Sequence, residues 1–296
     1  MHISRASFFT LGPLLVAAGA VSMRPGGAQT IPGRASTASG SLKVGNAVAA
    51  QFEDGPPLGS LRLVPGEIVH FSFTAEGFRK SAAGRVELTG HVQVFDPNGV
   101  AIFPKDEIPL IATLGEEDKD WKPKMRTEVA IPPIAPPGVY KVKFDVTDEQ
   151  SHESASGEAS FGVEAKFVAP AGALVVRELN FYRTQDDTTA LITPSYRAGD
   201  TVWVKFYITG YKYGEQNSID TSYDVELLSQ DGTSIMKQED AAMEKSMAYY
   251  PQPYIPGIFN LALKSTMTHA TYTLVVTAHD AMGKQTAAAQ AKFQVN

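Results

Sequence analysis

The sequence predicts an all-β protein made of two tandem β-sandwich domains, and three observations carry that prediction. Apolar and polar residues alternate with a period of two along many short stretches, as in strands with one buried face. Turns rich in Gly, Pro, Asn and Asp separate these stretches. The second half of the chain also repeats the first at a nearly constant spacing, which indicates an internal duplication.

The first 28 residues have the pattern of an export signal peptide. Arg5 supplies a positive charge, residues 8–21 form an apolar run, and residues 26–28 offer small side chains for cleavage. Residues 18–20 are a competing cleavage site. The apolar run is interrupted by Gly12-Pro13 and is shorter than the roughly 18 residues that a spanning helix needs. We therefore expect no stable membrane insertion after the signal is removed.

Two repeats follow a predicted flexible leader at residues 29–40, which are small and polar. Repeat one spans residues 41–164, and repeat two spans residues 173–296. The linker between them, residues 165–172, is short and contains Pro170, so we expect a stiff joint. The chain has no cysteine, and each repeat must therefore be stabilised by its own apolar core.

The repeat is visible in strands and in turns. Residues 65–73 return as residues 198–206, 133 positions later, and residues 140–148 return as residues 272–280. What both copies share should form the fold, and what differs is where function could lie.

Two tyrosines and two aspartates occupy matching positions around a long strand in each repeat. Tyr140 and Tyr272 each open such a strand, as in the tyrosine corner of immunoglobulin-like sandwiches, where the ring is buried and the hydroxyl bonds nearby backbone. Asp148 and Asp280 close the same strands ahead of a turn, which predicts turn capping. The sequence therefore predicts two Ig-like or fibronectin-III-like sandwiches.

The order of these motifs resembles the tandem Ig-like or fibronectin-III-like modules of uncharacterised exported bacterial proteins. The motifs that carry the resemblance are Pro65-Gly66-Glu67 before an alternating strand, the Asp96-Pro97-Asn98-Gly99 hairpin, Gly138-Val139-Tyr140, and Phe161 two residues before Val163. The resemblance covers residues 41–296. It implies the fold and a periplasmic or secreted location, and it carries over no catalytic or ligand-binding residue.

Charge and motifs argue against several classes of function. The formal net charge is −6, and basic runs are missing, which argues against nucleic-acid binding and against docking on anionic lipid. No serine-hydrolase elbow, zinc-protease motif, phosphate loop or cysteine nucleophile occurs. Histidines are dispersed, and Lys119 interrupts the acidic run at residues 116–120, unlike a calcium loop. We expect no catalytic residue, no cofactor and no bound metal.

Both repeats contain a long segment after the hairpin, at residues 104–127 and 237–260. Each segment carries an aromatic residue two positions before proline, Trp121 or Tyr254, which predicts an anchor that pins the segment to its sandwich. Helical spacing is limited to at most one or two turns, at residues 240–246.

Aromatic residues mark the difference between the repeats that we consider most informative. Ten of the eleven tyrosines lie after residue 172, and Trp203 and Lys205 occupy the outward positions that His70 and Ser72 hold in repeat one. Flat aromatic surface binds apolar peptide or sugar rings, although such rings also cover a protein's own sandwich. The candidate binding residues are Trp203, Tyr207, Tyr211, Tyr213, Tyr249, Tyr250 and Tyr254.

The sequence thus predicts a non-enzymatic exported protein that binds or spaces within the cell envelope. It would present loops and the aromatic face of repeat two to an envelope protein or glycan. The alternative is a carbohydrate-binding accessory module that works with a separate hydrolase.

Overall fold

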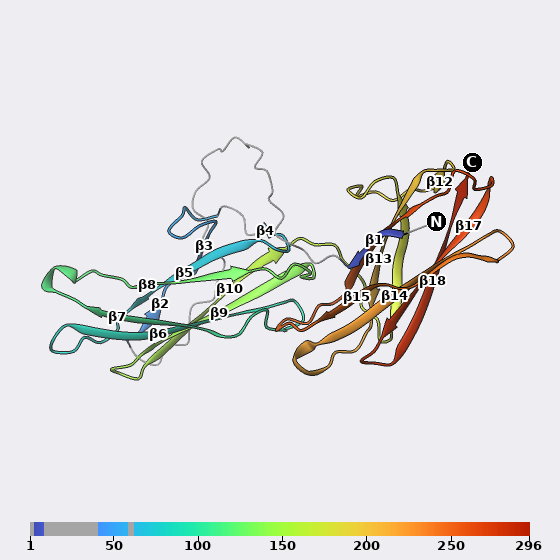
Figure 1. Ribbon diagram of the computed structural model, residues 1–296. Coiled ribbons are helices and arrows are strands. Elements are labelled where there is room, and N and C mark those ends of the chain that lie inside the picture. The colour runs from blue at the N-terminus through green and yellow to red at the C-terminus, as the bar shows by residue number, and fades with distance from the viewer. Residues whose placement is uncertain (1–2, 9–40, 59–61) are drawn as a thin grey trace. The chain divides into compact units, whose positions relative to one another are not determined.

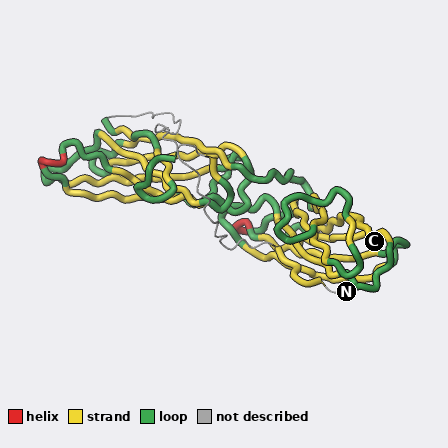
Figure 2. Tube along the Cα trace, turned by 90° about the horizontal axis from the view of Figure 1, so that it is seen from above, coloured by secondary structure: helices red, strands yellow, loops and turns green. Residues whose placement is uncertain are grey.

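The computed structural model describes residues 3–8, 41–58 and 62–296, which form two compact units (Figure 1). The N-terminal unit ends at Phe167, and the C-terminal unit begins at Val168 and includes strand β1 (Ile3–Phe8). Strands dominate the described residues, as the colours of Figure 2 show. The helices among them are the single turns η1 (Glu116–Asp118) and η2 (Glu215–Asn217). The predicted all-β class is confirmed.

The N-terminal unit contains a small sheet and a larger one. In the small sheet, β5 (Ile68–Glu76) pairs with β8 (Lys124–Ala130) and with the short strands β2 (Lys43–Val44) and β3 (Val48–Ala50). The larger sheet has the order β4 (Arg62–Leu63), β10 (Ser154–Val163), β9 (Gly138–Asp148), β6 (Arg85–Phe95) and β7 (Asp106–Thr113).

Alternating aromatic residues join these two sheets face to face. Phe71 and Phe73 on β5 are buried and point at the larger sheet. The Phe71 ring lies 5.8 Å from that of Phe161, and the Phe73 ring lies 4.8 Å from that of Phe144, measured between centroids. The predicted buried row of this strand is therefore the core of a β-sandwich.

The C-terminal unit also has a smaller and a larger sheet, and its smaller sheet has β1 as an additional edge strand. Its smaller sheet has the order β1, β16 (Ile255–Ala262), β13 (Thr201–Thr209) and β11 (Val175–Tyr182). Its larger sheet has the order β12 (Ser195–Tyr196), β18 (Gln285–Val295), β17 (Ala270–Asp280), β14 (Ile219–Leu228) and β15 (Ser234–Ser246). Phe206 on β13 meets Tyr223 on β14 edge to face, with 5.0 Å between centroids. The five strands of each larger sheet correspond one by one in chain order.

Each unit has a tyrosine corner at the start of its long central strand. Tyr140 donates a hydrogen bond from its hydroxyl to the Pro136 carbonyl at 2.9 Å. Tyr272 donates in the same way to the Thr268 carbonyl at 3.1 Å. Both rings are buried. The predicted tyrosine corners are confirmed.

A buried aspartate closes the same strand in each unit. Asp148 accepts hydrogen bonds from the backbone N–H of Gln150 in its own turn, at 2.9 Å, and of Arg79 in a distant loop, at 2.7 Å. Asp280 likewise binds the backbone N–H of Gly283, at 3.1 Å, and of Lys212, at 2.9 Å. The predicted turn capping is confirmed, and each carboxylate also holds the loop that follows β5 or β13.

The expectation of helical turns at residues 240–246 is wrong. These residues belong to β15, which pairs antiparallel with β14. Asp240 adopts a positive φ of 44°, and its N–H bonds the Asp224 carboxylate at 2.9 Å, so a β-bulge stands there. Pairing with the edge of a sheet overrides the local helical preference.

The long segment of the N-terminal unit contains β7, η1 and an aromatic anchor. Trp121 meets Phe78 edge to face, with 5.9 Å between ring centroids. The ring thus ties the end of this segment to the loop after β5, as predicted.

Strand β1 falls within the predicted signal peptide and lies at an edge of the smaller C-terminal sheet. It pairs antiparallel with β16, from Ile3 opposite Leu261 to Phe8 opposite Gly257. The rest of the predicted signal and the predicted leader lie outside the described residues. Across the described part of the chain, no helix has the length and apolar character needed to cross a membrane.

Candidate functional site

The smaller sheet of the C-terminal unit turns an aromatic row outward. Trp203, Lys205 and Tyr207 alternate on β13 with the fully buried Val204 and Phe206. The outward side chains are partly exposed, because β13 lies between β11 and β16 and only its inner row enters the core. Tyr207 meets Tyr254 edge to face, with 5.3 Å between ring centroids. Trp203, Tyr207 and Tyr254 are therefore accessible aromatic groups on a regular sheet.

Tyr211 and Tyr213 bind the chain just before β16. Both hydroxyls donate to the carbonyl of Gln252, that of Tyr211 at 2.5 Å. The two rings meet edge to face at 5.5 Å. Tyr211 is almost completely buried, and this burial raises the pKa of its hydroxyl far above the usual range. These two predicted binding residues therefore support a loop.

Tyr249 and Tyr250 lie next to each other in the chain but have opposite exposures. The Tyr249 side chain is 51% exposed, and its carbonyl accepts a hydrogen bond from the Asn217 amide at 2.7 Å. Tyr250 is buried. Of the seven predicted residues, five keep exposed surface, and Tyr211 and Tyr250 do not. The five are Trp203, Tyr207, Tyr213, Tyr249 and Tyr254.

Lys205 fills the space beside this aromatic row. Its ammonium lies 4.7 Å from the ring centroid of Tyr182 and donates a hydrogen bond to the Asp187 carbonyl at 2.6 Å. Burial lowers the pKa of Lys205, although the nearby Asp187 carboxylate opposes that change. The Asp187 carboxylate is itself held by the N–H and hydroxyl of Thr184. The loop after β11 is thereby fastened to the outer face.

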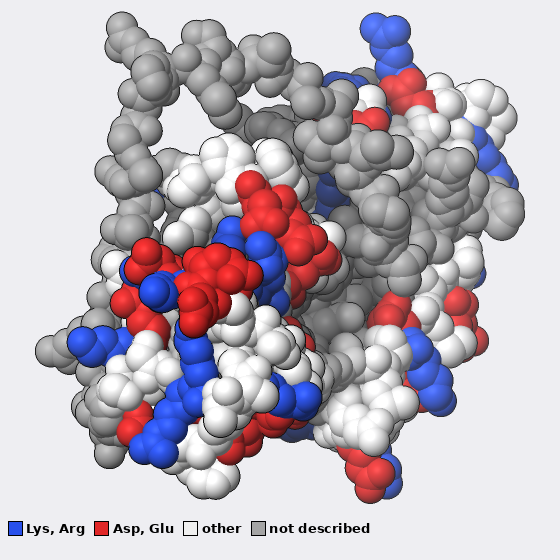
Figure 3. Space-filling model, turned by 90° about the vertical axis from the view of Figure 1, so that its left-hand side faces the viewer, with Lys and Arg blue, Asp and Glu red and all other residues white. Residues whose placement is uncertain are grey.

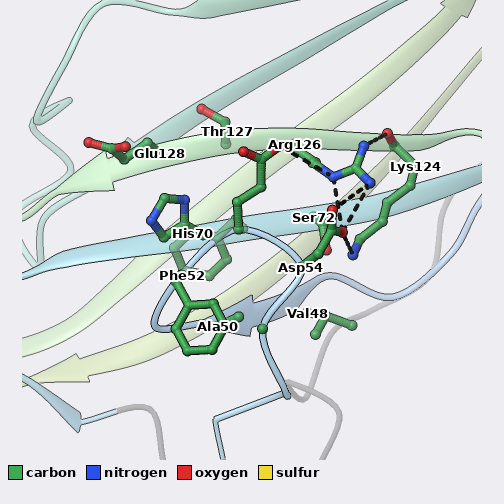
Figure 4. Close-up of a pocket in the computed structure, with 13 residues that line it drawn as sticks. Val48, Ala50, Phe52, Asp54, His70, Ser72, Lys124, Arg126, Thr127 and Glu128 are labelled. Carbon is green, nitrogen blue, oxygen red and sulfur yellow. Dashed lines mark hydrogen bonds and ion pairs between the residues drawn. The ribbon is translucent and has the colours of Figure 1, made fainter.

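The outer face of the smaller sheet in the N-terminal unit carries a pocket that the sequence did not indicate. It has a volume of about 210 Å³ and lies between the loop after β3 and the outer rows of β5 and β8 (Figure 4). The lining residues are Val48, Ala50, Phe52, Glu53, Asp54, Gly55, His70, Phe71, Ser72, Lys124, Arg126, Thr127 and Glu128.

The loop that covers this pocket is held by backbone geometry at one glycine and one aspartate. Asp54 has a positive φ of 56°, and the Gly55 N–H donates to the Phe52 carbonyl at 2.9 Å. A Cβ atom at Gly55 would lie 2.9 Å from that carbonyl oxygen and 3.0 Å from the Phe52 ring. Glycine therefore allows the loop to fold back on Phe52, whose side chain remains 58% exposed.

Charged groups are paired at one end of the pocket. The Asp54 carboxylate accepts from Lys124 at 2.7 Å and from Arg126 at 3.0 Å, and these hydrogen bonds lower its pKa. Figure 4 shows this cluster at one end and Phe52, His70 and Glu128 at the other. His70 and Glu128 are direct neighbours across β5 and β8. The pocket therefore has a neutralised end and an end with unused polar groups.

An Asp–His–Thr arrangement lies on the larger C-terminal sheet. His279 is 3.0 Å from the Asp224 carboxylate through Nε2 and 3.3 Å from the Thr286 hydroxyl through Nδ1. A hydrolytic triad also needs free N–H donors aimed at a developing oxyanion. These three residues stand on paired neighbouring strands, β14, β17 and β18, whose backbone groups serve the ladder. The arrangement is a surface hydrogen-bond chain without such donors.

The charged surface is mixed in sign. Basic and acidic side chains lie next to one another on the face shown in Figure 3. On the larger sheet of the N-terminal unit, Lys143 lies 3.9 Å from Glu158 across neighbouring strands, and His91 is hydrogen-bonded to Asp145 at 2.7 Å. Within the described ranges, no group of three or more His, Cys, Asp or Glu side chains could hold a metal ion.

No protein-family model and no curated protein matches this chain. Solved structures with some similarity include the C-terminal domain of the antigen I/II polypeptide BspA of Streptococcus agalactiae, at 10% identity over 84% of this chain and 99% of that one, with a TM-score of 0.27. The C-terminal domain of AspA, an antigen I/II-family protein of Streptococcus pyogenes, has 8% identity over 86% and 99%, with a TM-score of 0.30. The C-terminal domain of wzt has 10% identity over 47% and 83%, with a TM-score of 0.29. Similarities this weak carry no argument about fold or function.

Proposed function

We propose that this chain is an exported, non-enzymatic binding protein of the cell envelope, built from two copies of one β-sandwich module. The export part of the proposal rests on the charge, apolar run and small residues of residues 1–28. The duplication is supported by the matching strand order, the two tyrosine corners and the two buried aspartates.

The outward row of β13 is the observation that carries the binding function. Trp203 and Tyr207 stand on a strand that is hydrogen-bonded on both sides, and Tyr254 supports Tyr207 from the chain before β16. Rings held in this way lose little conformational freedom when a partner covers them. Trp and Tyr are also the residues that most often anchor protein–protein interfaces.

The seven candidate aromatic residues divide into two roles in this proposal. Trp203, Tyr207, Tyr249 and Tyr254 contact the partner, which we propose is a protein of the envelope. Tyr211 and Tyr213 position the loop through the Gln252 carbonyl, and Tyr250 packs inside it. Loss of a contact ring should weaken binding without unfolding the unit, whereas loss of a positioning ring should lower stability.

Partner capture from native envelope extract tests this function. Purified wild type and Trp203→Ala are compared, with Phe167→Ala as the control because that ring is 66% exposed and lies outside the face. We expect wild type and Phe167→Ala to retain the same proteins and Trp203→Ala to lose them at an unchanged melting temperature. Retention that does not depend on Trp203 contradicts the proposal.

The same rings support the alternative function, a carbohydrate-binding accessory module, because sugar rings also stack on flat aromatic surface. A glycan array and insoluble cell-wall polysaccharides, probed with the same three proteins, distinguish the two. Glycan binding that disappears in Trp203→Ala favours the accessory module and replaces the protein partner.

A further inference from the structure

The open end of the N-terminal pocket presents acceptors and an exposed ring. In the part of the chain that the structure describes, the side chains of His70 and Glu128 make no hydrogen bond or ion pair. Glu53 forms an ion pair with Arg126, with 3.7 Å between its carboxylate oxygen and the guanidinium nitrogen. Phe52 contributes a ring that is 58% exposed on a loop fastened through Asp54. Such a site suits a ligand that carries hydrogen-bond donors and an apolar stem.

The charge of the pocket favours a cation. Three carboxylates line it, from Glu53, Asp54 and Glu128, against the two cations Lys124 and Arg126. Both cations are engaged by Asp54, so an anionic ligand would have to displace that carboxylate. The carboxylate of Glu128 has no such partner and can receive a cation directly.

The C-terminal unit shows what occupies the corresponding place there. Lys205 extends along the outer face, sets its ammonium 4.7 Å from the Tyr182 ring centroid, and donates to the Asp187 carbonyl. An ammonium over an aromatic face and beside oxygen acceptors is a favourable arrangement for a lysine. This unit therefore fills its outer face with its own basic side chain.

Ser72 stands in the N-terminal unit where Lys205 stands in the other. Ser72 is opposite Arg126 on β8, as Lys205 is opposite Ile258 on β16. Each is the third outward residue of its strand and directly follows His70 or Trp203 in the outward row. The N-terminal unit has a loop after β3, the Phe52 ring and the Glu128 carboxylate, but it has the short side chain of Ser72 where the other unit has a lysine.

We infer that the N-terminal pocket binds a lysine side chain of a partner polypeptide. The methylene stem packs on Phe52, and the ammonium donates to Glu128 and to the neighbouring acceptors, in the way that Lys205 serves the other unit. This inference rests on the proposed function in one respect, namely that the partner is a polypeptide. The site itself is separate from the aromatic row of the C-terminal unit.

Titration with a short capped peptide, Gly-Gly-Lys-Gly-Gly, tests the pocket by amide NMR shifts of the purified protein. The matched probe is the same peptide with N-acetyl-lysine, which keeps the stem and removes the charge. We expect shifts confined to β3, β5, β8 and the loop after β3, and about tenfold or more weaker binding of the acetylated peptide. Equal binding of the two peptides, or shifts elsewhere, overturns the inference.

Variants of the pocket give an independent check. Ser72→Lys should place an internal ammonium in the pocket and abolish peptide binding, and Glu128→Gln should weaken it about threefold to tenfold. Glu107→Gln, the same charge change on exposed β7, should leave binding unchanged. If Ser72→Lys fails to fold, Phe52→Ala serves as a second test, because removal of the ring should also weaken peptide binding. Unchanged binding in Glu128→Gln and Phe52→Ala contradicts the site.

The outcome is separable from the partner experiment. Trp203→Ala should bind the lysine peptide like wild type, because it alters the other unit. Peptide binding with no Trp203-dependent partner refutes the proposed function and leaves the pocket, and the reverse result refutes the pocket alone.

Discussion

The two units share one framework, but the outer faces of their smaller sheets carry different side chains. Each has a small sheet on a five-stranded sheet, a tyrosine corner and a buried aspartate at the end of its long central strand. On the outer face, the C-terminal unit has Trp203, Tyr207 and an internally bound Lys205. The N-terminal unit has small and polar residues there, and a pocket. Interior positions are thus shared, while the outward row of a single strand sets the surface chemistry.

If the framework is shared, removal of the buried aspartate should damage the two units alike. Asp148→Ala leaves the N–H groups of Arg79 and Gln150 without their acceptor, and Asp280→Ala does the same to Lys212 and Gly283. We expect each change to lower the free energy of unfolding of its own unit by about 2–4 kcal/mol. Urea unfolding measures this, and Glu107→Ala serves as an exposed control.

A large loss at one aspartate and a negligible loss at the other would break the comparison, because the two carboxylates would then have different roles.

The stability of the N-terminal unit should depend on pH through the Asp148 carboxylate. Burial alone would raise the pKa of Asp148, but backbone donors from Arg79 and Gln150 and the Ser151 hydroxyl outweigh it, so the pKa is lowered. A lowered folded-state pKa adds stability that is complete above the unfolded value of about 3.9 and is lost as pH falls through the folded value. We expect wild type to lose more stability than Asp148→Asn between about pH 5 and pH 2. Parallel pH profiles for the two proteins would contradict this.

The tyrosine corners test the comparison of the two units through a smaller expected loss of stability. Tyr140→Phe and Tyr272→Phe each remove a hydroxyl that caps a backbone carbonyl, at Pro136 and Thr268. We expect a loss of about 1–3 kcal/mol in each unit by thermal or urea unfolding. Unaltered melting of either variant would remove the corner as a stabilising feature of that unit.

The outer face should contribute least to stability. Lys205→Ser removes the contact with the Tyr182 ring and the hydrogen bond to the Asp187 carbonyl. Because the site is partly exposed, we expect a loss of only about 0.5–1 kcal/mol, with Lys205→Arg retaining most of it. A loss as large as that of Asp280→Ala would mean that Lys205 belongs to the framework and not to the variable surface.

Local pattern was sufficient to predict the framework. Alternation along β5 and β13 gave the buried rows, and the positions of Tyr140 and Asp148 gave a corner and a turn cap. The sequence could not show that Asp148 also holds the loop at Arg79, because that contact joins residues far apart in the chain.

The candidate site was less predictable than the framework, for two physical reasons. Tyrosine is amphipathic, so its spacing does not distinguish a buried Tyr211 from an exposed Tyr249. The N-terminal pocket depends on hydrogen bonds from Lys124 and Arg126 to Asp54, which is about 70 residues away in the chain. No local sequence motif predicts such a contact. The strand at residues 240–246 was missed because edge pairing prevailed over local preference.

The reciprocal exchange of Ser72 and Lys205 tests the central claim most directly. The double variant Ser72→Lys, Lys205→Ser is titrated with the lysine peptide, and amide shifts are mapped on both units. The account predicts that shifts leave β5 and β8 and move to β13 and the loop after β11. Shifts that stay in the N-terminal unit, or that vanish from both units while each remains folded, would contradict it.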